Sequence, residues 1–536
     1  IVELTNEIGA KTLIEVSIEE FVSLTRFNVI TQSQGNYLFE GKDQHLMKLK
    51  RKLLNEEKPS KEISVLGWQK EGFFAWANGV YNGRFKEADD YGIVDHHGKY
   101  YFIPALSKIN EDDDGIHDND RKFKYLKGDI EFTEWAKLFK KVYHENNNST
   151  IGILYYCAAL FRDIVYRRLF FFPILNLFGV PGAGKNTMSL SMMSLFGEPQ
   201  TPFALGGVST AVGFMRKFAQ YRNALIWLDE YKNAVDRKIV ESLKNIYDGT
   251  GYTRGMKTND NKTHTSPIHS ACLLSGQELP TADPALFKRC ITLTFELRED
   301  RSKEEIHNFK TLTRWQEAGG LPRITCQLLQ FREKIEKEYD RVFDDTLDEY
   351  GLDLQGQSIE DRILKNMVCL VTIYNILKNE VDFPFEYEEL KAITQDFVVT
   401  QSKQIKSSSD VQRFWDIVQY LYESGDIKED YDFKANQDEG LVYIRLTKIY
   451  PLYMEAHRRQ YEARGMGKTS LISYLESSKA FKGHVKSTRF KDSNTSALMF
   501  HTKLLNVNLI KVDVLDYEQA KQEETQSQIF SDEHPF

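Results

Sequence analysis

Largely apolar runs, separated by longer stretches with helical periodicity, dominate the middle of the chain. Residues 172–178 and 224–228 form two such runs, and residues 271–274 and 290–295 form two more. Apolar side chains at successive positions are typical of strands buried on both faces, as in a parallel sheet covered by helices. The pattern therefore predicts an α/β fold, with a parallel sheet between helices, for this part of the chain.

The first run leads into residues 179–187, whose sequence is GVPGAGKNT, and a helical pattern follows. A glycine-rich turn between a strand and a helix directs backbone N–H groups into one concavity, and the lysine can reach the β- and γ-phosphates of a nucleotide. We therefore expect a phosphate-binding loop that takes ATP with Mg²⁺. The predicted nucleotide-binding residues are Gly179, Pro181, Gly182, Ala183, Gly184, Lys185, Asn186 and Thr187.

The loop departs from the usual pattern at the metal. The residue after the lysine normally carries a hydroxyl that ligates Mg²⁺, whereas this chain has Asn186 there and Thr187 one position later. An amide oxygen is a hard, neutral ligand that can still hold the ion. Asn186 is therefore predicted to contact the metal, with slower hydrolysis than a hydroxyl would support.

The second run ends in two carboxylates, Asp229 and Glu230. Downstream of a phosphate loop, this pairing predicts two separate roles: Asp229 holds the metal, and Glu230 polarises the attacking water. Lys185, Asp229 and Glu230 are therefore the predicted catalytic residues of an ATPase.

The third run ends in polar residues, among them Ser275 and Gln277, and Arg289 directly precedes the fourth run. This order of parts resembles the AAA+ ATPases. The resemblance implies that Gln277, or alternatively Ser275, is the sensor of the γ-phosphate. It also implies that Arg289 is a catalytic arginine finger, which acts on the nucleotide of a neighbouring subunit.

Between the second and third runs, two threonine-rich half-strands flank the turn Asn259-Asp260-Asn261, which predicts a β-hairpin. An insert of this kind is similar to that of superfamily 3 and MCM-like helicases of phages and mobile elements, including primase-helicases. The resemblance implies that the hairpin lines the pore of a ring and grips DNA. The alternative is an exposed polar hairpin with solvated charges. The predicted DNA-binding residues are Arg254, Lys257, Lys262 and His264.

The flanking segments have other patterns. Short aromatic and glycine-rich stretches precede the core. Helical patterns follow the core, and after them comes a basic strand at 482–491. On that strand Lys482, His484 and Lys486 share one face. We expect an α+β N-terminal accessory or collar domain (1–130), a helical linker (131–170), an AAA+ core (171–300), a helical lid region (301–405), a winged-helix-like domain (406–512) and a disordered acidic tail (513–536).

Composition narrows the class of protein. The 536 residues carry a net charge of −8, which argues against a broad basic surface that coats nucleic acid but allows a local basic element. No two of the five cysteines form a CxxC pair, and all five are predicted to be buried thiols. No apolar run is long enough for a membrane span, and no signal-peptide pattern is present, so we expect a cytoplasmic protein of a bacterial or phage-infected cell without membrane contact.

Together these patterns predict an ATP-dependent DNA helicase or translocase that forms a ring, most simply a hexamer, in phage or mobile-element replication. DNA, single-stranded or forked, is the expected partner, with a primase or an initiator as a further one. One alternative is an AAA+ switch or loader that remodels a protein or nucleoprotein complex without unwinding. Another is a nucleotide-binding module in which Asn186 has abolished hydrolysis.

Overall fold

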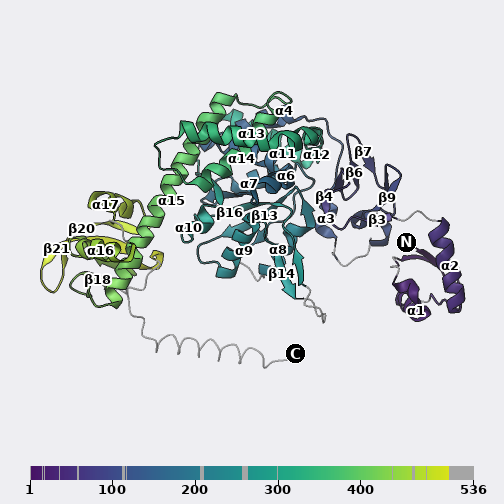
Figure 1. Cartoon of the computed structure of the whole chain (residues 1–536), viewed down its shortest axis with the longest axis horizontal. Coiled ribbons are helices and arrows are strands. Elements are labelled where there is room, and N and C mark those ends of the chain that lie inside the picture. The colour runs from purple at the N-terminus through teal and green to yellow at the C-terminus, as the bar shows by residue number, and fades with distance from the viewer. Residues whose placement is uncertain are drawn as a thin grey trace. The chain divides into compact units, whose positions relative to one another are not determined.

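The computed structural model describes residues 2–14, 16, 19–35, 37–56, 60–110, 115, 117–205, 211–255, 263–298, 300–436, 439–461, 465–478 and 480–505. The chain forms two compact units (Figure 1). The first contains Ile1–Pro280 and Ala285–Gln401, and the second contains Thr281–Pro284 and the chain from Ser402 onward. In the part of the chain described, no helix combines the length and the apolar character needed to cross a membrane.

A five-stranded parallel sheet forms the centre of the first unit, which confirms the predicted α/β class with a parallel sheet. Its order is β11 (Phe203–Ala204), β13 (Leu225–Tyr231), β16 (Ala271–Gly276), β10 (Ile174–Gly179) and β17 (Cys290–Phe295). The four longer strands correspond to the four apolar runs. Because all the strands are parallel, their carboxyl ends share one edge, and loops at that edge can build a single site.

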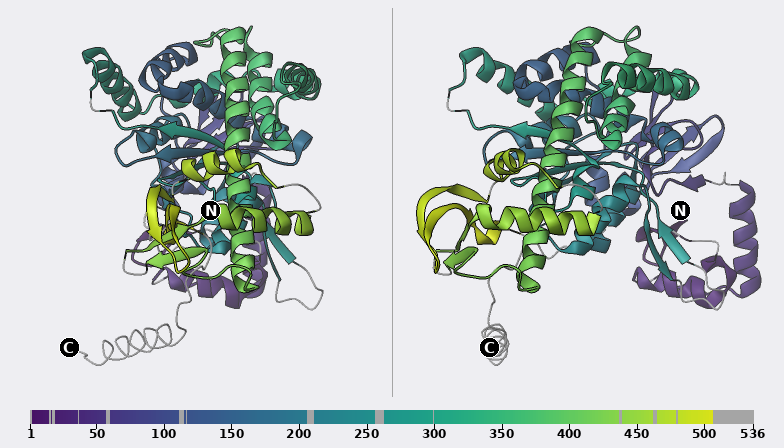
Figure 2. Two further views of the ribbon diagram at one scale, coloured as in Figure 1. Left: turned by 90° about the vertical axis from the view of Figure 1, so that its left-hand side faces the viewer. Right: turned by 60° about the vertical axis from the view of Figure 1, so that its left-hand side comes forward.

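The first unit, of which Figure 2 gives two further views, contains the helices α4 (Phe132–Val142), α5 (Asn148–Leu160), α6 (Arg162–Leu169), α7 (Lys185–Met193), α8 (Ala211–Gln220) and α9 (Arg237–Tyr247). Helix α7 contacts β10 and β16 of the sheet, and α4 and α6 contact α5. Every residue of α5 is buried. A Cβ on Gly152 would lie 2.3 Å from the Cε atom of Met188, so glycine permits α5 to pack closely against α7. This packing places the first residue of α5 near the phosphate loop.

The N-terminal segment begins with β1 (Val2–Thr5), β2 (Lys11–Ile14), α1 (Leu24–Ser33) and α2 (Asp43–Glu56). It continues with a sheet of β3 (Ser60–Glu62), β9 (Lys99–Phe102) and β8 (Ile93–His96), and with a second sheet in the order β12 (Tyr221–Arg222), β4 (Leu66–Trp68), β5 (Phe74–Trp76), β6 (Gly79–Tyr81) and β7 (Phe85–Glu87).

Strand β12 comes from the segment just before β13, so this second sheet joins the N-terminal segment to the core. A Cβ at Gly67 would lie 1.9 Å from the carbonyl oxygen of Arg222, and Gly67 has φ +89°, so only glycine suits this pairing. The indole of Trp76 also donates to the carbonyl of Phe196 at 2.8 Å.

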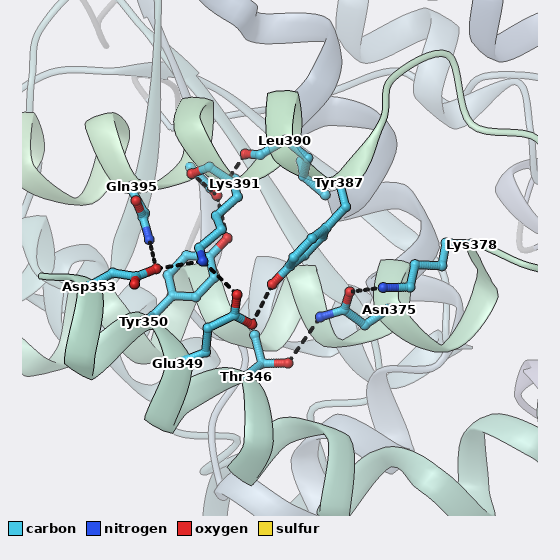
Figure 3. Close-up of polar contacts among 11 residues, drawn as sticks. Thr346, Glu349, Tyr350, Asp353, Asn375, Lys378, Tyr387, Leu390, Lys391 and Gln395 are labelled. Atoms are coloured by element: carbon cyan, nitrogen blue, oxygen red, sulfur yellow. Dashed lines mark hydrogen bonds and ion pairs between the residues drawn. The ribbon is translucent and has the colours of Figure 1, made fainter.

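Five helices follow the central sheet: α11 (Lys303–Glu317), α12 (Pro322–Leu329), α13 (Arg332–Asp353), α14 (Asp361–Leu377) and α15 (Tyr387–Glu423). Lys391 of α15 lies between two carboxylates of α13, at 2.6 Å from Glu349 and 2.6 Å from Asp353 (Figure 3). The hydroxyl of Tyr387 donates to Glu349, and Gln395 donates to Asp353. The network therefore fixes the amino half of α15 on α13.

We expect Lys391→Met to lower the midpoint of thermal unfolding by about 2–4 °C at pH 7. The bonds from Lys391 and Gln395 lower the pKa of Asp353, so their contribution is present above the ordinary pKa of aspartate and is lost as pH falls through the lowered value. The difference between wild type and variant should therefore shrink when calorimetry is repeated near pH 3. Among the described residues, the contacts of the Lys378 ammonium are with the neutral side chains of Asn375 and Tyr387, so Lys378→Met is the control and should show a smaller, pH-independent effect. A difference that stays constant with pH would contradict the ionic role.

The second unit contains the carboxyl-terminal part of α15, α16 (Leu446–Tyr461), α17 (Lys468–Ser477) and an antiparallel sheet in the order β18 (Phe433–Asn436), β19 (Leu441–Ile444), β21 (Asn494–His501) and β20 (Phe481–Arg489). Its core includes Phe414, Trp415, Phe433 and Phe500. The basic strand expected at 482–491 corresponds to β20, on which Lys482, His484 and Lys486 are exposed. The winged-helix assignment stays a prediction, and the acidic tail lies outside the described residues.

Candidate functional site

The phosphate loop connects the carboxyl end of β10 to the amino end of α7. Gly182 and Gly184 have φ of +79° and +103°, a conformation that favours glycine. A Cβ on Gly179 would lie 2.2 Å from the carbonyl oxygen of Phe295, so glycine also permits β10 to approach β17 at this point. No side chain caps the amino end of α7, and its first N–H groups therefore remain available to an anion.

Lys185, the first residue of α7, is 7% exposed. Its ammonium group donates to the carbonyls of Gly179 and Val180 at 2.6 and 2.8 Å. Burial lowers the pKa of Lys185, and the negative charge of Asp229 opposes that shift. The lysine is thus held within the loop, where the charge of Asp229 on β13 acts on it.

Asp229, near the end of β13, is fixed by two side chains from other elements. The hydroxyl of Ser275, on β16, donates to its Oδ1 at 2.5 Å, and the amide of Asn186 donates to its Oδ2 at 3.2 Å. The indole of Trp227 donates to the Ser275 hydroxyl at 2.7 Å, which leaves that hydroxyl's own proton for Asp229. The structure thus brings Lys185, Asn186, Asp229 and Ser275 together at one edge of the sheet.

Asn186 can contact a carboxylate and a metal at the same time. Its Nδ2 atom donates to Asp229, and the geometry of the amide then leaves Oδ1 as an acceptor for a cation. Among the described residues, no group of three or more His, Cys, Asp or Glu side chains converges.

Glu230 has a left-handed backbone, with φ +63°. Its N–H donates to Oδ1 of Asp229 at 2.8 Å, and the pairing of β13 with β16 shifts between Leu228 and Tyr231. Holding a non-glycine residue in this conformation costs about 1–3 kcal/mol of folding free energy, and such residues cluster at functional sites. The side chain is exposed, as a group that acts on a bound water requires.

The two predicted sensor residues occupy different environments. Ser275 is fully buried and contacts Asp229, whereas Gln277 follows the end of β16 and is exposed. The contact with Asp229 thus belongs to Ser275, and the sensor role of either residue stays a prediction.

Arg289 lies at the opposite edge of the sheet from the phosphate loop of its own chain. It precedes β17, which pairs in parallel with β10 from Cys290 opposite Ile174. Its guanidinium pairs with Asp248 at 2.9 Å, donates to the carbonyl of Ala285 and lies over the ring of Tyr247. The structure therefore does not bring Arg289 to the other predicted catalytic residues. If Arg289 acts on a nucleotide, that nucleotide is bound to a neighbouring subunit. This role stays a prediction.

The hairpin between the second and third apolar runs contains β14 (Tyr252–Gly255) and β15 (Thr263–Ser266), which pair antiparallel with Arg254 opposite His264. Lys257 and Lys262 lie outside the described residues. Both strands lie near α8. DNA binding by the four predicted residues stays a prediction.

A cavity beside the phosphate loop contains functional candidates that the sequence patterns did not indicate. Its lining includes Asn148, at the start of α5, and Arg298, after β17, together with Gly184 and Thr187 of the loop. The available signal was the run Asn146-Asn147-Asn148. Asn146 and Asn147 adopt left-handed backbones, with φ of +50° and +56°, and the third asparagine begins the buried helix.

A family described only as a domain of unknown function, DUF927, matches residues 80–266, a stretch that contains the phosphate loop and the Asp229-Glu230 pair. Among curated proteins nothing matches. Similar solved structures include "SCCmec type IV Cch - active helicase", which is 13% identical over 94% of this chain and 91% of that chain, with a TM-score of 0.48. Another is the apo A form of the NrS-1 C-terminal region (305–718), which is 12% identical over 80% of this chain and 96% of that chain, with a TM-score of 0.24.

Proposed function

We propose that this protein is an AAA+ ATPase that couples ATP hydrolysis to movement along DNA and unwinds it as a ring-forming helicase of a phage or mobile element. The observation that carries the proposal is the convergence of Lys185, Asn186, Asp229 and Ser275 at the carboxyl edge of the parallel sheet. A glycine-rich loop, an uncapped helix end, a buried lysine and a fixed carboxylate are together the parts of a nucleoside triphosphatase.

The strand order supports the AAA+ assignment. Strand β10, which leads into the phosphate loop, lies between β16, which carries Ser275, and β17, which Arg289 precedes. The carboxylate strand β13 is next to β16. The phosphate loop, the carboxylate pair, Ser275 and Arg289 follow one another in the sequence. Each lies on, or directly beside, one of four adjacent strands of the sheet.

Each group has a distinct task in this reaction. The loop N–H groups and Lys185 bind the phosphates, and Asn186 and Asp229 hold Mg²⁺, which supplies positive charge where the phosphoryl group is transferred. Glu230 orients the attacking water and accepts its proton. Ser275 keeps the Asp229 carboxylate in place between β13 and β16.

Further parts of the proposal concern assembly. Arg289 acts on the nucleotide of a neighbouring subunit, most simply within a hexamer, because it is far from the loop of its own chain. This role requires its ion pair with Asp248 to open. The β14–β15 hairpin contacts DNA through Arg254, Lys257, Lys262 and His264, and a primase or an initiator is a further partner of the ring.

Turnover of ATP by the purified full chain tests the proposal. We expect Mg²⁺-dependent hydrolysis that Lys185→Ala abolishes and that Lys238→Ala, a control on the exposed face of α9, leaves unchanged. Wild-type protein that neither binds nor hydrolyses ATP would exclude the proposed reaction. ATP binding without hydrolysis would instead favour the alternative of a nucleotide-binding module in which Asn186 has abolished hydrolysis.

Neutralising the hairpin by Lys257→Ala plus Lys262→Ala should weaken DNA binding and leave basal ATP turnover intact. Each lost phosphate contact lowers the dependence of log Kd on log salt by about 0.9 on duplex DNA and about 0.7 on single strands. Fluorescence anisotropy at several salt concentrations measures this slope. The control is Lys310→Ala plus Lys337→Ala, which removes the same charge from exposed positions on α11 and α13. An unaltered slope in the hairpin variant would leave the hairpin as a solvated surface loop.

A further inference from the structure

The cavity beside the phosphate loop, called here the base cavity, lies between the core and α11. Thr187 belongs to the phosphate loop and α7, Phe295 ends β17, and Phe309 belongs to α11. The ring of Phe295 is buried and that of Phe309 half-buried, so both offer apolar surface to a planar group. A nucleotide whose phosphates occupy the loop would carry its sugar and base away from it, and this cavity is next to the loop residues Gly184 and Thr187.

Asn148, which lines the base cavity, has an unused hydrogen-bond acceptor in its buried side chain. The residue is 2% exposed, and its Nδ2 donates to the carbonyl of Thr294 at 2.8 Å. A carbonyl oxygen can only accept, so this contact fixes the amide with its nitrogen toward Thr294. Within the described part of the chain, Oδ1 of Asn148 has no hydrogen-bond partner. An orphaned buried acceptor is costly, and a ligand that donates to it removes that cost.

Arg298 closes the base cavity. Its guanidinium lies 2.8 Å from Glu145, in the turn before α5, and 2.5 Å from Glu305, in the first turn of α11. Bonds from Ser302 and Arg298 lower the pKa of Glu305 to about 2, so this partner is ionised at neutral pH. The volume of this partly open cavity is about 60 Å³, room for a few water molecules but not for a purine. Access for a base therefore requires the Arg298 bridge to open.

We propose that Asn148 is a specificity-determining residue that selects adenine by accepting a hydrogen bond from its exocyclic amine, and that the Arg298 bridge gates access to this base cavity. A 6-oxo purine would place a second acceptor against Oδ1 and leave both unsatisfied. The inference rests on the proposed function, since it concerns the base of the same nucleotide.

Competition of ATP and ITP against a fluorescently labelled ADP tests the selection, because ITP has an oxo group in place of the amine and, with it, a proton on N1. We expect wild type to bind ATP on the order of tenfold more tightly than ITP, or more. Asn148→Leu should lose this preference while retaining phosphate-dependent binding. The matched control is Asn146→Ala: Asn146 donates to the same Thr294 carbonyl at 3.1 Å but is exposed, and its loss should leave the preference intact.

Equal affinity of wild type for ATP and ITP would overturn the selection even if Asn148→Leu fails to fold, and so would a preference that persists in that variant. The purine riboside triphosphate, which lacks both amine and oxo groups, should bind with intermediate affinity. Arg298→Met removes the bridge and should raise the association rate of the nucleotide several-fold in stopped-flow experiments. An unchanged rate would overturn the proposal that the bridge gates access to the cavity. Failure of all nucleotides to bind would instead reject the proposed function itself.

Discussion

Glu230→Gln should leave ATP affinity nearly unchanged and lower turnover by about 10²–10⁴-fold, the range for loss of a positioned general base. The substitution preserves the shape of the side chain. The contacts of Asp229 with Asn186, Ser275 and the N–H of residue 230 do not involve the Glu230 carboxylate and should survive. Steady-state hydrolysis together with equilibrium nucleotide binding measures both halves of this expectation.

Glu241→Gln is a suitable control, because it makes the same chemical change on an exposed position of α9. It should hydrolyse ATP at the wild-type rate. Unchanged turnover in Glu230→Gln would remove Glu230 from the mechanism.

Arg289→Ala should preserve the nucleotide affinity of isolated subunits and lower assembly-dependent ATP turnover by about 10³–10⁵-fold, the value of an arginine supplied in trans. Turnover measured across a range of protein concentrations separates the assembled from the isolated form. The side chain is 13% exposed and bound to Asp248, so a purely structural role must be distinguished.

Asp248→Asn makes that distinction, because it removes the charged partner and keeps the arginine. If Arg289 only stabilises the fold, both variants should lose stability and activity together. If Arg289 acts on a neighbouring nucleotide, Asp248→Asn should retain most of the assembly-dependent turnover.

Mixing gives a second test of shared sites. An Arg289→Ala, Glu230→Gln double variant should inhibit wild type more than in proportion to its fraction. Linear dilution would show that active sites do not lie between subunits.

The sequence allowed the sheet and the glycine-rich turn between β10 and α7 to be predicted because their signals are local. Strands β10, β13, β16 and β17 contain the four largely apolar runs, and the glycines at 182 and 184 occupy conformations that glycine adopts readily. The position of Asp229 at a strand end likewise needed no tertiary information.

Other features depend on contacts between distant residues. Strand β12 has two residues, and its pairing with β4 joins segments more than 150 positions apart. Asn148 becomes a candidate only because Thr294 fixes its amide, Oδ1 has no hydrogen-bond partner among the described residues, and the residue lines a cavity. The ion pair of Arg289 with Asp248 is equally non-local. Helix α5 is buried on all sides, so it lacks the amphipathic period that marks a helix facing solvent.

Displacement of a labelled strand from forked DNA by the full chain tests the central claim most directly. The account predicts displacement that requires ATP and Mg²⁺, is lost in Lys185→Ala, and is accompanied by hydrolysis that DNA stimulates. Hydrolysis that DNA does not affect, with no strand displaced at any protein concentration that supports assembly, would contradict it and favour an ATPase that remodels another protein.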